Sequence, residues 1–220
     1  MARKEESKEK EEDIRWKYLL NELLELIMSR LFLGDFISFR LVCKPWSPIS
    51  PAPLSIPPHF DSQKYQWFIC IPNNNKGGCN FFDPIYKNSY FVTIPYIAGA
   101  IIRHSKYGWL LMSKGEFSFF FFNPITRQTI KLTDIMQSYK SKGITFSSPP
   151  TSKDCIAFIY YNDWWSISIL TCSPGDDEWN CKYLFSNEEK FIGSRCNPVF
   201  HDGALYCLSM DGRIGVFVQS

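Results

Sequence analysis

The sequence predicts an α+β chain in which a small helical module precedes a larger all-β domain. Three observations support this fold class. Leucines between residues 19 and 31 recur with the 3.6-residue period of a helix. Beyond residue 60 that period disappears, and short apolar runs alternate with clusters of turn residues, as in strands and hairpins. Aromatic residues make up 17% of the chain, and they favour the half-buried surfaces of β-sheets.

The composition of the 220 residues excludes several classes of protein. Hydrophobic residues make up 45% and charged residues 21%, which disfavours disorder and coiled-coil rods. A net charge of +2 is too small to attract a phosphate backbone, so we expect no nucleic-acid partner. No apolar stretch approaches the roughly 18 residues that cross a bilayer, so we expect no membrane partner. The charged N-terminus lacks the apolar region of a signal peptide, which favours the cytoplasm or the nucleus.

Composition shifts divide the chain into four segments. Residues 1–15 are almost entirely charged and are expected to form a disordered tail. Residues 16–50 carry the helical period and form the helical module. Residues 51–62 are rich in proline and predict a linker. Residues 63–220 form the predicted β domain.

The helical module begins with an amphipathic helix. Its apolar stripe consists of Leu20, Leu23, Leu24, Ile27 and Leu31. Gly34 ends this helix, and Asp35 offers a cap for a second helix that carries apolar residues as far as Cys43. Pro45 suits the first turn of a third, short helix.

An internal repeat of about 40 residues organises the β domain. Residues 81–93 align with residues 121–133, with five identical positions. In each copy an aromatic strand ends, Asp-Pro or Asn-Pro starts a tight turn, and a second strand returns. Two less regular units follow at 155–185 and 198–218. The period is that of four-stranded propeller blades, so we predict an incomplete propeller-like domain of about four blades.

The last unit contains two Asp-Gly pairs, at residues 202–203 and 211–212. Both pairs predict tight turns, because glycine and aspartate tolerate the positive φ angles that such turns require. We expect the second pair to form a hairpin of the primed type.

Residues with catalytic or metal-binding chemistry are sparse, and we expect no enzyme, no cofactor and no metal. No Cys-x-x-Cys pair offers zinc spacing, so the eight cysteines are interpreted as buried thiols on strands. The histidines, His59, His104 and His201, are expected on the surface or in turns. The acidic cluster at residues 176–178 is interpreted as a solvated turn, because it lacks calcium-loop spacing.

The aromatic runs have two different interpretations. Phe119 to Phe122 alternate between the two faces of a strand, and blades pack on both faces, so we predict core packing. Trp164 and Trp165 follow a predicted turn, where large rings are harder to bury. We therefore predict these two tryptophans as contacts to a target protein.

The N-terminal motifs carry a resemblance to a known family. The segments Trp16–Leu20, Leu23–Leu31 and Asp35–Trp46 resemble an F-box. Together with the aromatic Asn/Asp-Pro repeats and the Asp-Gly-Ala-Leu-Tyr segment at 202–206, they make the chain similar to plant F-box proteins with a KIB-type, kelch-like β-propeller. The resemblance covers about residues 14 to 218.

The resemblance implies the substrate-recognition subunit of a Skp–cullin–F-box E3 ubiquitin ligase. The F-box would dock on a Skp-family adaptor and through it on a cullin, and the propeller would present an unidentified target protein. The receptor itself would perform no chemistry. By position, the adaptor-binding residues would be Leu19, Leu20, Leu23, Leu24, Ile27, Leu31, Val42, Cys43 and Trp46.

The residues themselves are consistent with an adaptor partner but leave an alternative open. A unit of about 35 residues is too small to bury all its apolar side chains, and exposed apolar surface indicates a partner. The alternative is a propeller interaction scaffold outside any ligase, in which the helices pack against the propeller and adaptor binding has been lost.

Overall fold

A computed structural model describes residues 19–28, 68–72, 76–84, 87–136, 143–162, 166–185 and 191–218. Contacts divide the chain into two units. The first comprises residues 1–69 and 80–90, and the second comprises residues 70–79 and 91–220. In the described ranges, no helix has both the length and the apolar character needed to cross a membrane.

The described part of the predicted helical module contains helix α2 (Asn21–Met28). The carbonyl oxygen of Leu20 accepts hydrogen bonds from the backbone N–H groups of Leu23 and Leu24, both at 3.1 Å, and these bonds start the helix. The predicted second and third helices lie outside the described residues.

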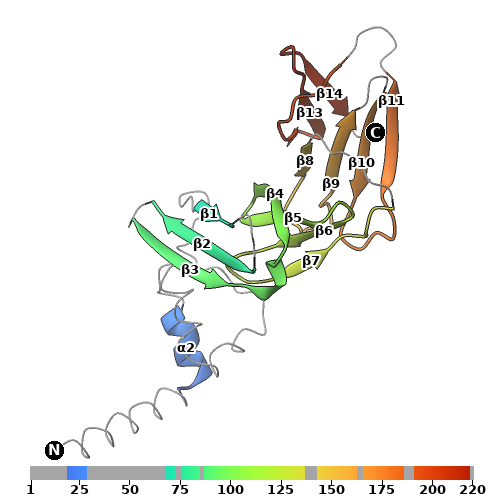
Figure 1. The fold of residues 1–220 in the computed structure, drawn as a ribbon. Coiled ribbons are helices and arrows are strands. Elements are labelled where there is room, and N and C mark those ends of the chain that lie inside the picture. The colour runs from blue at the N-terminus through green and yellow to red at the C-terminus, as the bar shows by residue number, and fades with distance from the viewer. Residues whose placement is uncertain are drawn as a thin grey trace, which may run out of the picture. The chain divides into compact units, whose positions relative to one another are not determined.

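The described strands belong to antiparallel sheets that follow one another along the chain, shown in sequence colours in Figure 1. The first sheet contains β1 (Phe68–Cys70), β2 (Gly78–Asp83) and β3 (Asn88–Thr93) in that order. After the short 3-10 helix η2 (Pro95–Ile97), the second sheet contains β4 (Ala100–Lys106), β5 (Trp109–Lys114), β6 (Ser118–Phe122) and β7 (Thr129–Lys131).

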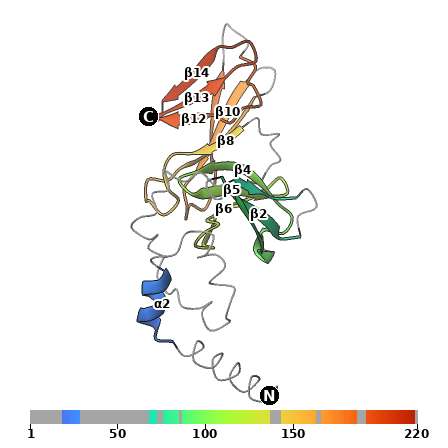
Figure 2. The ribbon, with the colours of Figure 1, turned by 90° about the vertical axis from the view of Figure 1, so that its left-hand side faces the viewer.

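The remaining two sheets occupy the C-terminal half of the chain. The third sheet contains β8 (Gly143–Phe146), β9 (Ala157–Asn162), β10 (Ser166–Cys172) and β11 (Asn180–Phe185). The fourth contains β12 (Val199–His201), β13 (Ala204–Leu208) and β14 (Ile214–Val218), which Figure 2 shows side by side. In each four-stranded sheet the strands are ordered by sequence, as in a propeller blade.

Two apolar cores join successive sheets within the second unit. One core lies between the second and third sheets and includes Leu111, Phe121, Phe146, Ile159 and Leu170. The other lies between the third and fourth sheets and includes Phe158, Tyr160, Ile169, Leu205 and Cys207. Adjacent residues of a strand face opposite sides, so Phe158 and Ile159 belong to different cores. Strand β9 of the third sheet therefore contributes side chains to a core on each face of the sheet.

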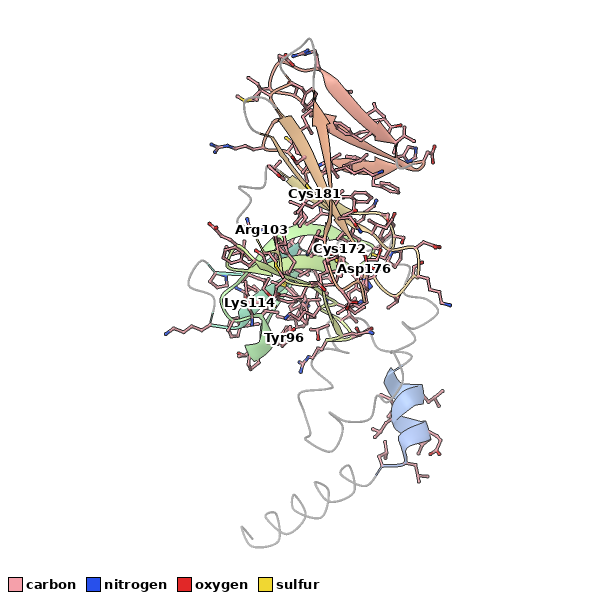
Figure 3. All side chains as sticks on the ribbon, turned by 90° about the vertical axis from the view of Figure 1, so that its right-hand side faces the viewer. Tyr96, Arg103, Lys114, Cys172, Asp176 and Cys181 are labelled. Carbon is pink, nitrogen blue, oxygen red and sulfur yellow. The ribbon has the colours of Figure 1, made fainter. Side chains whose placement is uncertain are left out.

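The second sheet is also covered on both faces, which confirms the core packing predicted for the phenylalanine run. Phe119, Phe120, Phe121 and Phe122 are all buried. Tyr96 meets the edge of the Phe120 ring, with centroids 5.3 Å apart, and the Lys114 ammonium group lies 5.0 Å from the centre of the Tyr96 ring. The labels of Tyr96 and Lys114 mark this contact in Figure 3.

The backbone reproduces the 40-residue repeat in detail. Lys87 and Arg127, which are 40 residues apart, have φ angles of 54° and 58°. The side chain of Asn123 accepts hydrogen bonds from the backbone N–H groups of Ile125 (2.9 Å) and Thr126 (3.0 Å). Asp83, at the equivalent position of the first copy, is buried like Asn123. The Asp/Asn-Pro turn is therefore a structural unit that two successive sheets share.

The expectation for the Asp-Gly turns was wrong about which pair forms the primed turn. Asp202 and Gly203 have φ angles of 46° and 75°, as a two-residue primed hairpin between β12 and β13 requires. At the second pair the loop from β13 to β14 contains five residues, 209–213, so a two-residue turn is not formed. There the N–H of Gly212 bonds to the carbonyl of Ser209 instead, at 3.1 Å.

The cysteines follow the prediction only in part. Cys79, Cys155, Cys172 and Cys207 are buried, but Cys70 and Cys196 are exposed. Cys70 lies on the short strand β1, whereas Cys196 lies in the loop before β12. Cys43 lies outside the described residues.

Candidate functional site

Helix α2 carries an exposed ridge of leucines. Leu23 and Leu26 are 46% and 51% exposed, and Leu20, just before the helix, is 67% exposed. Residues three apart on a helix are neighbours on its surface, so Leu20, Leu23 and Leu26 form one line. We call these three residues the leucine ridge. The exposed Glu22 lies four residues before Leu26 and is therefore its neighbour on the helix surface.

The predicted adaptor-binding residues fall into three groups. Leu20 and Leu23 are exposed, Leu19 and Ile27 are half-buried, and Leu24 is buried at 1% exposure. The other predicted residues, Leu31, Val42, Cys43 and Trp46, lie outside the described residues, as do Trp164 and Trp165. Leu26 was missed, although its position three residues after Leu23 was a signal for it.

A polar cluster connects the first strands of the last three sheets. Strand β8 lies beside both β4 and β12. The Asn197 side chain, just before β12, accepts a hydrogen bond from the Ile144 N–H at 3.1 Å. Its amide nitrogen donates to the Arg103 carbonyl at 2.8 Å and to His104 Nδ1 at 3.1 Å. The His104 Nε2–H then donates to Thr145 Oγ1 at 3.2 Å.

This cluster fixes the protonation state of His104. The Ile144 N–H can only donate, so the Asn197 oxygen must face it and the amide nitrogen must face His104. His104 Nδ1 is therefore an acceptor, and the ring is neutral with its proton on Nε2. Burial, followed by the nearby positive charge of Lys106, lowers the pKa of His104 from 6.5.

The structure corrects the sequence expectation for His104. It was expected on the surface or in a turn, but it lies half-buried on β4, with its ring edge-on to Phe146 at 5.6 Å. Arg103, labelled in Figure 3, extends the cluster by donating through Nε to Ser113 Oγ at 2.8 Å. Lys106 and Tyr107 add bonds to the carbonyl oxygens of Phe200 (3.4 Å) and Ser147 (3.0 Å). The cluster joins the second, third and fourth sheets.

A cleft of about 520 Å³ lies between the third and fourth sheets. Strands β10 and β11 supply Ile169, Thr171 and Lys182 to its wall, and strands β13 and β14 supply Leu205 and Val218. The lining mixes apolar side chains with polar groups, which is the usual character of a recognition surface.

The described residues contain no group of three or more side chains suited to hold a metal ion. Burial raises the pKa of Cys155 and Cys172 to about 11, so both thiols stay protonated at neutral pH. Asp176 Oδ2 accepts the Ser173 N–H at 2.7 Å and closes the exposed turn that carries the acidic cluster, as predicted for a solvated turn.

Comparison with known proteins gives relatives along most of the chain. An F-box/kelch-repeat protein of Arabidopsis thaliana, At1g57790, is 32% identical over 93% of this chain and 56% of its own length. The F-box/kelch-repeat protein KIB1 of the same plant is 27% identical over 98% of this chain and 56% of its own length. The F-box protein At4g12382, also of Arabidopsis thaliana, is 32% identical over 60% of this chain and 89% of its own length.

The chain spans about half the length of several curated relatives, with 56%, 50% and 53% of three of them covered. The KIB1-4 beta-propeller family matches residues 81–220, which include nearly all of the described sheets. The four consecutive antiparallel sheets and the repeated Asp/Asn-Pro turns are consistent with this family match. The chain therefore belongs to the KIB1-4 β-propeller family and is homologous to plant F-box/kelch-repeat proteins.

Proposed function

We propose that this chain is the substrate-recognition subunit of a Skp–cullin–F-box ubiquitin ligase. The N-terminal helices dock on a Skp-family adaptor, the adaptor connects them to a cullin, and the propeller sheets present a target protein. The receptor itself is non-catalytic. Membership of the KIB1-4 family and homology to proteins named as F-box proteins support this role.

The leucine ridge is the observation that carries the proposal. Fully burying a leucine is favourable by about 2 kcal/mol, and each ridge leucine has roughly half of its surface or more still exposed. A partner that covers all three therefore gains roughly 3 kcal/mol from the ridge alone. A Skp-family adaptor is the occupant that the relatives' F-box names favour.

The test measures binding of a purified Skp-family adaptor to the full chain by biolayer interferometry. Leu23→Asp and Leu26→Asp place a charge on the ridge, and each should weaken binding at least tenfold. Ile101→Asp places the same charge at an apolar position of β4 that is 56% exposed and lies outside the helix, so it serves as the matched control. Leu24→Asp is unsuitable, because burying a charge at a position that is 1% exposed would unfold the helix.

A folded wild-type chain that binds no Skp-family adaptor would exclude the ligase assignment. The burial of Leu24 favours the remaining candidate, a propeller scaffold whose helix packs on its own chain. In that case the same proteins would co-purify with the Leu23→Asp variant as with the wild-type chain.

The proposal assigns target recognition to the propeller sheets. Trp164 and Trp165 remain the predicted target contacts, and the cleft between the third and fourth sheets is a further candidate surface. We propose the cytoplasm or the nucleus as the location, which a fluorescent fusion would check. Proximity labelling under proteasome inhibition would identify the target and the adaptor together.

A further inference from the structure

Strand β4 carries three basic residues on one face because it contains a β-bulge. The register with β5 shifts between Ile102 and His104, so Arg103 is the extra residue of the bulge. Arg103 bonds to Ser113, a buried residue on the face of β5 that packs on the third sheet. His104 also faces the third sheet, and Lys106, two positions further along the strand, points to the same side. The bulge therefore directs all three side chains toward the neighbouring sheets.

Arg103 and Lys106 are half-buried cations whose partners are all neutral. Arg103 Nε donates to Ser113 Oγ at 2.8 Å. Lys106 Nζ lies 3.4 Å from the Phe200 carbonyl oxygen and 4.7 Å from the centre of the Tyr107 ring. Neither cation makes an ion pair within the described ranges, whereas two exposed cations elsewhere in the chain do. A cation that loses part of its hydration is stabilised by a nearby anion, so both positions lack the partner that their burial favours.

A third cation lies beside this pair. Asn197 donates to the Arg103 carbonyl at 2.8 Å, and Phe200 accepts a bond from Lys106, so the segment 195–200 runs along β4. Arg195 is exposed and lies two residues before Asn197, which places their Cα atoms no more than about 7 Å apart. Among the described carboxylates, none forms an ion pair with Arg195. We call Arg103, Lys106 and Arg195 the basic surface.

The spacing of the basic surface fits several carboxylates on one chain better than a single small anion. Positions 103 and 106 are about 10 Å apart along an extended strand. Their charged groups also contact different sheets, since Arg103 reaches β5 and Lys106 reaches β12. The exposed Tyr107 adds a ring that can pack against an extended segment. The adjacent turn contributes Asp202, but its carboxylate faces His201 at 3.3 Å rather than the basic surface.

We propose that the basic surface binds an acidic segment of the target protein. Assigning the segment to a target rests on the proposed function, which places target recognition on the propeller sheets. Carboxylates of the segment supply the anions that Arg103 and Lys106 lack, and the guanidinium group of Arg103 can bind one carboxylate at two points. The basic surface shares no residue with the leucine ridge, so the two sites can be tested separately.

Fluorescence anisotropy of fluorescein-labelled octaglutamate, titrated with the full chain, tests the site. The wild-type protein should bind the peptide, and rising salt should weaken binding because it screens the charges. Arg103→Gln and Lys106→Gln each remove one charge and should each weaken binding about fivefold. Lys131→Gln removes the same charge from an exposed position of β7 and is the matched control, which should bind as the wild type does. Circular dichroism checks folding, and Lys106→Gln stays informative if Arg103→Gln does not fold.

Three results would overturn the proposal. The first is a folded wild-type chain that does not bind octaglutamate, and the second is equal binding by the wild type and the folded Arg103→Gln and Lys106→Gln variants. The third is displacement of the peptide by inorganic phosphate at the same concentration, which would show a site for a small anion. Adaptor binding should be unchanged in both variants. A chain that binds octaglutamate but no adaptor would refute the ligase role alone, and the reverse result would refute the basic surface alone.

Discussion

The hydrogen bonds around His104 predict that the stability of the propeller depends on pH. His104 Nδ1 accepts a hydrogen bond from the side-chain N–H of Asn197. A proton on Nδ1 would therefore face another donor, which disfavours the charged ring. Its folded-state pKa lies below 6.5 because of burial and of the charge on Lys106. The unfolded chain therefore binds more protons than the folded chain as the pH falls below about 6.5.

The sign and size of the effect follow from this difference. The stabilising contribution is fully present above pH 6.5 and is lost as the pH falls toward the folded-state pKa of His104. Each unit between the two pKa values is equivalent to about 1.4 kcal/mol of unfolding free energy. Asn197→Ala should in addition lower the stability by about 1 to 2 kcal/mol at pH 7.5, because the buried Ile144 N–H loses its partner, whereas water can replace the exposed bond to the Arg103 carbonyl.

A nearly isosteric change should reverse the pH dependence. Asn197→Asp places a carboxylate oxygen opposite His104 Nδ1, and a protonated ring can donate to it. In that variant the pKa of His104 should rise, and stability should increase as the pH falls from 7.5 toward 6. His104→Gln removes the titrating group and is the control for the other two histidines.

Urea unfolding of the full chain, followed by tryptophan fluorescence at pH 5.5, 6.5 and 7.5, measures these effects. The wild-type protein should lose more stability between pH 7.5 and 5.5 than His104→Gln does. Equal losses in the two proteins would refute the assignment of the pH dependence to His104. A wild-type pH slope in Asn197→Asp would refute the hydrogen-bond direction inferred for the cluster.

Two further predictions concern packing and thiol reactivity. Gly193→Ala should lower the free energy of unfolding by about 3 kcal/mol, because the new Cβ would lie 1.9 Å from the Tyr160 hydroxyl oxygen. Tyr160→Phe should restore part of that loss in urea titrations, and additivity of the two changes would contradict the clash. Burial raises the pKa of Cys207 to about 12, so iodoacetamide at pH 8 should modify the exposed Cys70 and Cys196 first. Peptide mass spectrometry would show this order, and equally fast labelling of Cys207 would contradict it.

Much of the sheet structure could be predicted because both copies of the repeat contain the same pattern of strand, turn and strand. The aligned segments 81–93 and 121–133 became β2–β3 and β6–β7, with the same turn between them. Strand β4 was not predicted, because Arg103, His104 and Ser105 interrupt its apolar pattern. Arg103 and His104 belong to the cluster between sheets, so tertiary contacts overrode the local signal.

The sites could be predicted less well because they depend on distant residues. His104 receives its partner from Asn197, which is 93 positions away, and no local pattern indicates that pairing. In α2 the periodicity identified an apolar arc but not which part of it the chain covers. Leu24 is buried and Leu23 is exposed, although both lie in the predicted stripe. The residue pattern predicts that this segment is helical, but the contacts that the helix makes with other parts of the chain decide which of its leucines are buried.

The two cores of the second unit follow one another along the chain, so its stability is expected to depend on contacts between neighbouring sheets, as in a repeat protein. Each core joins only adjacent sheets, so local opening is expected to begin where a sheet has one neighbour and to spread inward. Amide protons of β9 and β10, enclosed on both faces, should then be the last to exchange with deuterium. Those of β14, which has one described strand neighbour, should exchange earlier.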